Sequence, residues 1–191
     1  MSDSVIREVS SSLPFKDRLV VHTSGNSDIQ VIDSKNRAGV LYPLQSFRKE
    51  KKIHWNDVPL LLEAENEKDL QLIQRLAKSM TDKVYLITSK QRSRIHLTAV
   101  FVNNFVNHLY SIGAELSEQA QIPFEIFIPL IKQTTRSLET SPAKTTQTGP
   151  AVRGDNSTIE SHLDQLKDPL YKDIYKSITR SIIKTHGGEK L

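Results

Sequence analysis

The sequence predicts an α/β part followed by an all-α part, with the boundary near residue 88. Short apolar runs alternate with amphipathic helical patterns up to Thr88, which is typical of βαβ units and a largely parallel sheet. Beyond Thr88 no further strand pattern occurs, and helical patterns take over. We therefore expect two domains, at residues 1–88 and 89–191.

Four short apolar runs predict the strands of the first part. They are residues 19–22, 39–44, 58–62 and 84–87. Ser2 or Asp3 is suited to cap a short first helix that ends at Leu13-Pro14. Residues 67–80 repeat apolar side chains at helical spacing and predict an amphipathic helix, whereas residues 27–37 fit either a helix or a loop.

The all-α part begins with a long helical pattern from residue 89 to about residue 121, which only Gly113 interrupts. Pro123 suits the first turn of the next helix, which extends to about residue 138. Ser, Thr, Pro, Lys and Gln dominate residues 139–150 and predict an exposed loop. Two more helices are expected at residues 156–166 and 169–185, the first with a capping-box spacing at Ser157 and Glu160.

Composition excludes several kinds of site. The chain of 191 residues has no cysteine, so disulfides, thiolate metal sites and cysteine nucleophiles are absent. Its six histidines are too dispersed for a local metal signature. The formal net charge is +4, but acids are interleaved with bases even in the run Arg48–Lys52, so that run reads as a solvated loop and no nucleic-acid partner is expected.

One uncharged stretch, residues 95–114, has the length of a membrane span. It contains three asparagines and two histidines, whose burial in lipid would be costly. We interpret it as a helix packed within protein and expect no membrane association. The first twenty residues lack the apolar core of a secretory signal, so we expect a cytoplasmic protein.

The long helix carries a stripe of uncharged polar side chains opposite an apolar face. On a helical wheel the stripe consists of His96, Asn103, Asn104, Asn107, His108 and Ser111. A solvent face would carry Lys and Glu, so this stripe fits a cleft or a subunit interface. We predict His96, Asn104 and His108 as catalytic candidates, with either imidazole as the proton donor, and Asn103 as a substrate contact. The alternative is structural, with these side chains satisfying backbone groups of neighbouring helices.

The second candidate is the glycine-containing loop of residues 146–155, which leads into a helix. Backbone N–H groups at a helix start favour anions, and Arg153 adds a bidentate donor. We therefore predict that Thr148, Gly149 and Arg153 hold an anionic substrate. An ordinary helix entry, with Arg153 paired to Asp155 or another acid, explains the same residues.

The third candidate is the turn after the first predicted strand, with His22, Ser24 and Gly25. In open parallel sheets, ligands bind at the carboxyl ends of strands. We therefore predict these residues as cofactor neighbours, although an ordinary turn has the same composition.

Several motifs in order resemble one family. They are His22–Gly25, Gly39–Phe47, His96–Phe105 with His108-Leu109, and Gln147–Asp155 with His162-Leu163. In this order and spacing the chain resembles bacterial Rossmann-like proteins with a C-terminal domain of unknown function, which are described as NADP-dependent oxidoreductases. They are similar in architecture to pyrroline-5-carboxylate reductase and 6-phosphogluconate dehydrogenase-like enzymes.

The resemblance implies a Rossmann-like domain with a helical domain like the C-terminal one of 6-phosphogluconate dehydrogenase, and NADP or NAD as cofactor. It implies an active-site cleft between the two domains, with Ser24 and Gly25 on the nicotinamide side. The long helix 89–121 and the loop of residues 149–155 would line the substrate side. It also implies a homodimer, which we expect to form through helix 89–121.

The family's G-x-G-x-x-G loop is absent from this sequence. We therefore expect only the C-terminal portion of the Rossmann-like sheet, and a chain that is poorly soluble or needs a partner chain. A truncated oxidoreductase acting on a small anionic substrate is the first hypothesis. A non-catalytic dimerising or ligand-binding module is the alternative.

Overall fold

The computed structural model describes residues 3–49 and 52–186. The chain divides into two compact units, residues 1–107 and 108–191. The division falls inside the long helix and not near residue 88, because the first half of that helix makes its contacts with the sheet.

The first unit is built on a four-stranded sheet in the order β1 (Leu19–His22), β2 (Arg37–Pro43), β3 (Leu60–Ala64) and β4 (Val84–Leu86). The predicted strands are confirmed within two or three residues at each end. Pairings β1–β2 and β3–β4 are parallel, whereas β2–β3 is antiparallel. The sheet is therefore mixed. Among the described residues between β2 and β3, the only helix is the short 3-10 helix η3 (Trp55–Asp57), and no crossover helix there restores the strand direction.

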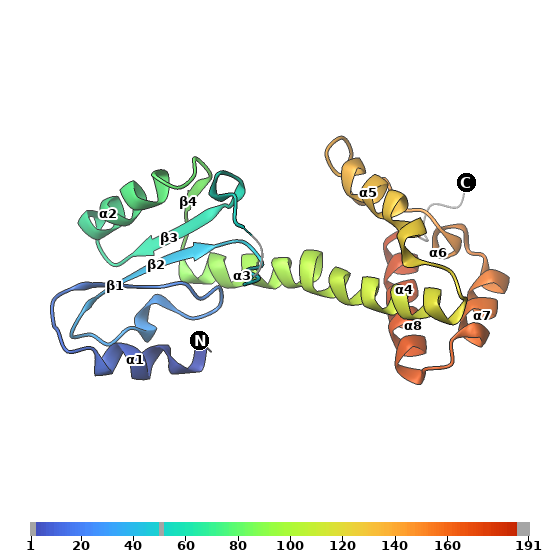
Figure 1. Ribbon diagram of the computed structural model, residues 1–191, viewed down its shortest axis with the longest axis horizontal. Helices are drawn as coiled ribbons and strands as arrows, with labels where there is room; N and C mark the ends of the chain where they lie inside the picture. Colours follow the sequence, from blue (N-terminus) through green and yellow to red (C-terminus); the bar gives the residue numbers. More distant parts are fainter. Residues whose placement is uncertain (1–2, 50–51, 187–191) are drawn as a thin grey trace. The chain divides into compact units, whose positions relative to one another are not determined.

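Helices cover both faces of this sheet (Figure 1). One core lies between the sheet and α2 (Glu67–Lys78) and consists of Val58, Leu60, Leu62, Ile73 and Ala77. On the other face, near α1 (Ile6–Ser12) and the 3-10 helix η2 (Ile29–Val31), lies a second core of Ile29, Ile32, Ala38 and Val40. Alternation along β2 explains the two cores, because Val40 and its neighbour Leu41 point to opposite faces.

Local signals fix the helix starts in the first unit. The Asn66 side chain accepts a hydrogen bond from the N–H of Asp69 and caps α2. Asp69 is buried and accepts from the Arg37 guanidinium, with Nε at 2.8 Å from Oδ2. Helix α1 differs from the prediction: a 3-10 turn, η1 (Asp3–Val5), precedes it, and no side chain caps it. Ser2, the other predicted cap, lies outside the described residues.

The long helix runs without a break from Ser89 to Gln119, but it is not a regular α-helix. A capping box between Thr88 and Gln91 starts α3 (Ser89–Ala99). A π-helical segment, η4 (Val100–Phe105), follows and leads into α4 (Val106–Gln119). The expected interruption at Gly113 is wrong, since Gly113 lies inside α4, where a Cβ would find Phe124 at 3.4 Å.

The second unit contains α4, the 3-10 helix η5 (Phe124–Phe127), α5 (Ile128–Ser137), α6 (Pro150–Arg153), α7 (Asn156–Gln165) and α8 (Pro169–His186). The predicted capping box at Ser157 and Glu160 does not form. The Asp155 side chain caps α7 instead, because it accepts from both the N–H and the hydroxyl of Thr158. Only two hydrophobic residues of this unit, Ile112 and Ala151, are buried among those the structure describes.

No described helix combines the length and the apolar character that crossing a membrane requires.

Candidate functional site

A polar cleft of about 430 Å³ lies in the first unit, between the end of β2 and the segment formed by α3 and η4. Its polar lining consists of Tyr42, Gln45, Ser46, His96, Thr98, Asn103 and Asn104. Within the described residues, no Lys, Arg, Asp or Glu side chain lines it. The cleft is therefore suited to hydrogen bonding with an uncharged group.

The centre of the cleft is a tyrosine–histidine pair. The Tyr42 hydroxyl lies 3.1 Å from Nδ1 of His96, and the two rings meet edge to face with centroids 6.1 Å apart. Burial raises the pKa of Tyr42 above its ordinary value, with a smaller contribution from the Asp3 carboxylate. Tyr42 therefore stays a neutral phenol at physiological pH.

The turn after β1 packs directly against this pair at Gly25. A Cβ at this position would lie 2.5 Å from Nδ1 of His96 and 2.8 Å from Cζ of Tyr42. Only glycine allows so close an approach. Gly25, predicted as a cofactor neighbour, is thus next to His96, one of the two predicted candidates for the proton donor.

The π-helical segment supplies the two asparagines of the cleft. Asn103 donates from Nδ2 to the Ser46 hydroxyl oxygen at 2.7 Å. Asn104 lines the same cleft. The structure therefore brings together three of the predicted site residues, namely His96, Asn103 and Asn104. Sequence reasoning missed Tyr42 and Ser46 as site residues, although both belong to the stretch Gly39–Phe47 that carried the resemblance.

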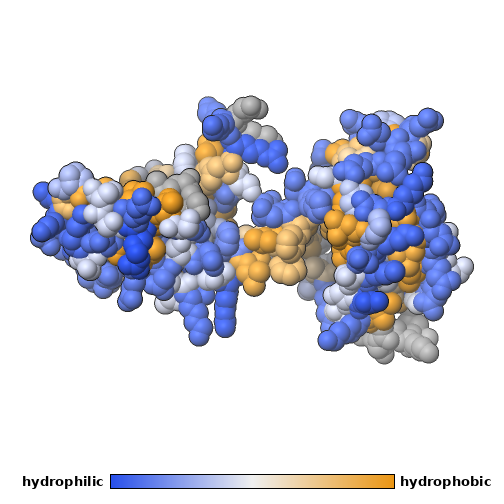
Figure 2. All heavy atoms as spheres, turned by 90° about the horizontal axis from the view of Figure 1, so that it is seen from below, coloured by the Kyte–Doolittle hydropathy of each residue, from blue (hydrophilic) through white to orange (hydrophobic). Residues whose placement is uncertain are grey.

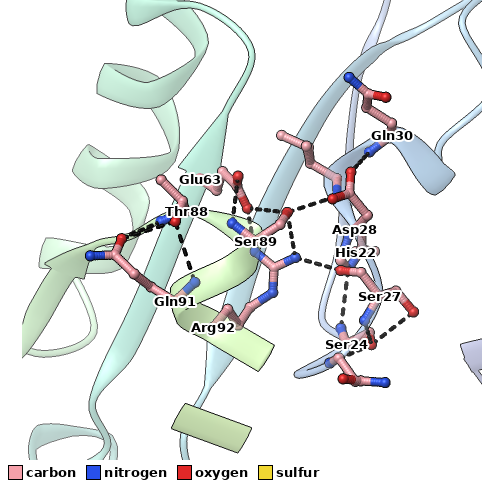
Figure 3. Close-up of polar contacts among 12 residues, drawn as sticks. His22, Ser24, Ser27, Asp28, Gln30, Glu63, Thr88, Ser89, Gln91 and Arg92 are labelled. Atoms are coloured by element: carbon pink, nitrogen blue, oxygen red, sulfur yellow. Dashed lines mark hydrogen bonds and ion pairs between the residues drawn. The ribbon is translucent and has the colours of Figure 1, made fainter. Parts of the chain in front are cut away.

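His22 and Ser24 use their polar atoms to build the turn itself (Figure 3). Nδ1 of His22 accepts from the N–H of Ser24 at 3.2 Å. The Ser24 hydroxyl accepts from the N–H groups of Asn26 and Ser27 at 3.1 and 2.9 Å. The geometry thus gives both residues a role in holding Gly25 in place.

His22 is almost fully buried. Burial lowers its pKa below the ordinary value, and the Arg92 cation lowers it further, while the Asp28 backbone carbonyl offsets part of the effect. Nε2 of His22 has no hydrogen-bond partner among the described residues. His22 and Ser24 line a second cavity of about 450 Å³, which lies beside α1 and the edge strand β1 and does not include Gly25.

A buried arginine ties the same turn to α3 and β3 (Figure 3). Arg92 forms an ion pair with Glu63 and donates to the backbone carbonyl of Ser27. Glu63 also accepts from the backbone N–H and the hydroxyl of Ser89 at 2.8 and 2.7 Å. This network fixes the turn relative to α3, on which His96 lies one helical turn beyond Arg92.

The remaining predicted residues belong to the second unit. His108 is exposed and does not line the cleft. Gly149 has a left-handed φ of +110° that favours glycine, and Arg153 is exposed on α6, a helix of only four residues. Thr148 lines a largely apolar cavity of about 250 Å³ between α4, α6 and α8. Among the described residues of this unit, no acid forms an ion pair with Arg153. The pKa of Asp155 is lowered chiefly by the two hydrogen bonds from Thr158, and the charge of Arg153 makes a smaller contribution.

These features together define a class of protein: an α/β unit with a polar cleft beside the carboxyl ends of the parallel strands β1 and β2, followed by a helical unit. The sequence profile of the DUF2520 family, a domain of unknown function, matches residues 58–182. The chain belongs to this family. None of the curated proteins matches it.

Two solved structures are similar to the chain. One, from Bacteroides fragilis, is described as a "putative NADP oxidoreductase"; it shares 34% identity over 96% of this chain and 73% of its own, with a TM-score of 0.89. The other, a protein from Thermotoga maritima, shares 21% identity over 98% of this chain and 76% of its own, with a TM-score of 0.77. The fold is therefore Rossmann-like α/β with a helical region.

Proposed function

We propose that this chain belongs to an NADP-dependent oxidoreductase and that the cleft around His96 is where its substrate reacts. The observation that carries the proposal is the contact between Gly25, at the carboxyl end of β1, and the Tyr42–His96 pair. Ligands of open α/β sheets bind at such strand ends. The 34% identical relative described as an NADP oxidoreductase supports the same reading.

The residues present fit the reactive end of a nicotinamide cofactor. The cleft offers uncharged hydrogen-bonding groups suited to a carboxamide, and Gly25 allows close approach of a backbone. The sequence contains no G-x-G-x-x-G, so we assign no residue to the pyrophosphate. When bound, the cofactor would supply or accept the hydride.

The chain's own residues would bind and orient the substrate and handle the proton. His96 would donate a hydrogen bond or proton to the reacting oxygen or nitrogen, and Asn104 would orient the group that carries it. Asn103, held by Ser46, would shape the wall of the cleft. As a separate contact, Thr148, Gly149 and Arg153 of the helical unit would bind an anionic group.

Titration of the chain with NADPH, NADH or NADP⁺ tests this proposal. We expect saturable binding that shifts the backbone NMR signals of Gly25 and the ring signals of His96 more than those of His162, which is in the helical unit. His96→Gln should slow hydride transfer to a screened set of small carbonyl and imine compounds by about 100-fold, and His162→Gln should not. If no nicotinamide cofactor binds, the oxidoreductase reading fails and a non-catalytic dimerising or ligand-binding module takes its place.

A homodimer is the second part of the proposal. Leu97, Phe101, Val102 and Phe105 on the long helix are each at least half exposed. Apolar side chains also reach the surface of the helical unit (Figure 2), which buries very few of them. Such surfaces mark interfaces, and a second copy of the chain would cover them.

Light scattering after size-exclusion chromatography tests the dimer. We expect twice the mass of the chain, 2 × 21.7 kDa. Phe101→Glu with Phe105→Glu should give a monomer, while Lys90→Glu, a charge change of the same helix, should leave the dimer intact. A monomeric wild-type chain at high concentration would contradict the proposed dimer.

A further inference from the structure

We infer that Tyr42 is a positioning residue of the cleft: its phenol donates to Nδ1 of His96 and thereby fixes the neutral imidazole with its proton on Nε2. The inference deepens the proposed function, because it says which group His96 presents to a substrate. It rests on two neighbours of His96, Tyr42 and Gly25.

The direction of the hydrogen bond follows from the acid and base strengths of the two groups. Tyr42 makes one hydrogen bond within the described residues, the 3.1 Å contact to His96. A phenol O–H is a stronger donor than a neutral imidazole N–H, and the unprotonated imidazole nitrogen is a stronger acceptor than a phenol oxygen. The phenol therefore donates. Nδ1 accepts, and the neutral ring carries its proton on Nε2.

Gly25 lies against the same edge of the ring as Tyr42. A Cβ at Gly25 would lie only 2.5 Å from Nδ1 of His96. The Gly25 backbone is therefore so close that the imidazole has little room to rotate. The Gly25 turn is itself held by the Ser24 hydroxyl and by Arg92. A phenol and a backbone thus enclose the Nδ1 edge of the ring, and no hydrogen bond joins its Nε2 to another described residue.

A fixed Nε2–H selects the ligand by its chemistry. The cleft presents a hydrogen-bond donor beside uncharged amides and hydroxyls, and none of its described lining residues is a cation that could attract an anion. The group that meets His96 is therefore a neutral hydrogen-bond acceptor, such as a carbonyl oxygen or an imine nitrogen.

The ¹⁵N resonances of the histidine rings test the inference directly, above the pH at which the rings become neutral. In the wild-type chain we expect His96 to show an unprotonated, hydrogen-bonded Nδ1 and a protonated Nε2. Tyr42→Phe removes one oxygen, and we expect it to shift the Nδ1 resonance and to increase the fraction of the Nδ1–H tautomer.

The chain contains a matched control, the exposed pair of His162 and Tyr175 in the helical unit, with Nδ1 and the hydroxyl 2.9 Å apart. Tyr175→Phe should shift the ring signals of His162 and leave those of His96 unchanged. Gly25→Ala should displace the His96 signals with Tyr42 intact, whereas Gly113→Ala should not.

Two results would overturn the inference: a wild-type His96 that carries its proton on Nδ1, or His96 signals that are the same in Tyr42→Phe as in the wild type. The first needs no variant, so poor folding of Tyr42→Phe cannot leave the question open. Neither measurement needs a cofactor. Failure to bind NADPH would therefore remove the proposed function and leave the Tyr42–His96 geometry standing.

Discussion

Arg92 of α3 and Glu63 of β3 form an ion pair in which the arginine side chain is only 1% exposed and the glutamate 16%. Two charges so far from water are costly unless each meets its partner and further hydrogen bonds. Ser89 and the Ser27 carbonyl provide those bonds. The pair therefore locks the turn after β1 to the helix that carries His96.

Breaking this pair on one side should be strongly destabilising. Glu63→Gln leaves Arg92 buried without its anion, and we expect a loss of about 3 kcal/mol in the free energy of unfolding, measured by urea denaturation. Arg92→Met with Glu63→Leu should cost less than Glu63→Gln, because no buried charge remains. The exposed pair Lys83–Asp57 is the control, and Asp57→Asn should change stability by less than about 0.5 kcal/mol. Equal effects at Glu63 and Asp57 would contradict the assignment.

The buried His22 should make the stability of the protein depend on pH. Its folded-state pKa is below the ordinary value of 6.5, chiefly through burial. As the pH falls, His22 therefore takes up a proton in the unfolded chain before it does so in the folded one. The free energy of unfolding keeps its full value above pH 6.5 and decreases progressively below that pH. We expect the melting temperature of the wild type to fall between pH 7.5 and 5.5. His22→Asn, which keeps an acceptor for the Ser24 N–H, should flatten this dependence, and His108→Asn should not.

The pair of Asp69 and Arg37 should protect the fold against acid. The hydrogen bond from Arg37 lowers the pKa of Asp69 below its ordinary value of 3.8. The folded state holds the carboxylate more strongly than the unfolded chain, so this stabilisation is present above 3.8 and disappears as the pH falls below it. Asp69→Asn should lose about 2 kcal/mol at pH 7 and less near pH 2. Urea titrations at the two pH values measure the difference, and an equal loss at both would refute the explanation.

Asn104 should matter more for binding than for folding. Its side chain is exposed in the cleft and is not part of either core. Asn104→Leu should weaken NADPH or substrate binding by about tenfold, the effect of one lost hydrogen bond, with a melting temperature close to that of the wild type. Gln133→Leu, an exposed amide on α5, controls for the change in surface polarity. A large loss of stability with intact binding would show that Asn104 is structural.

The strands and most helices were predictable because their signals are local. Apolar runs marked β1 to β4, and helical periodicity marked α2. The antiparallel direction of β3 was not predictable, because a residue pattern does not reveal which way the connecting chain turns. Among the residues that the sequence marked as a site, His96, Asn103 and Asn104 share the cleft, and their signal was a polarity unusual for a helix.

The partners of those residues were hidden, because their roles arise from contacts distant in sequence. Tyr42 reads as an ordinary strand aromatic, yet it meets His96, 54 positions later. Arg92 reads as a surface cation in a sequence, whereas the fold buries it against Glu63. The helical wheel assumed 100° per residue throughout, and the π-helical segment breaks that assumption.

The π-helical segment determines how the long helix would respond to the loss of one residue. A π segment holds one residue more than the α-helix that would replace it, so deleting one residue from 100–105 is the change that would restore a regular helix. Because the widened π turn absorbs the extra residue, the deletion would leave α3 and α4 close to their present phase about the helix axis. His96 would keep its place beside Tyr42, while the side chains of the segment itself, among them Asn103 and Asn104, would change their direction relative to it. The length of this segment therefore sets which side chains share a face with His96, independently of their chemical type.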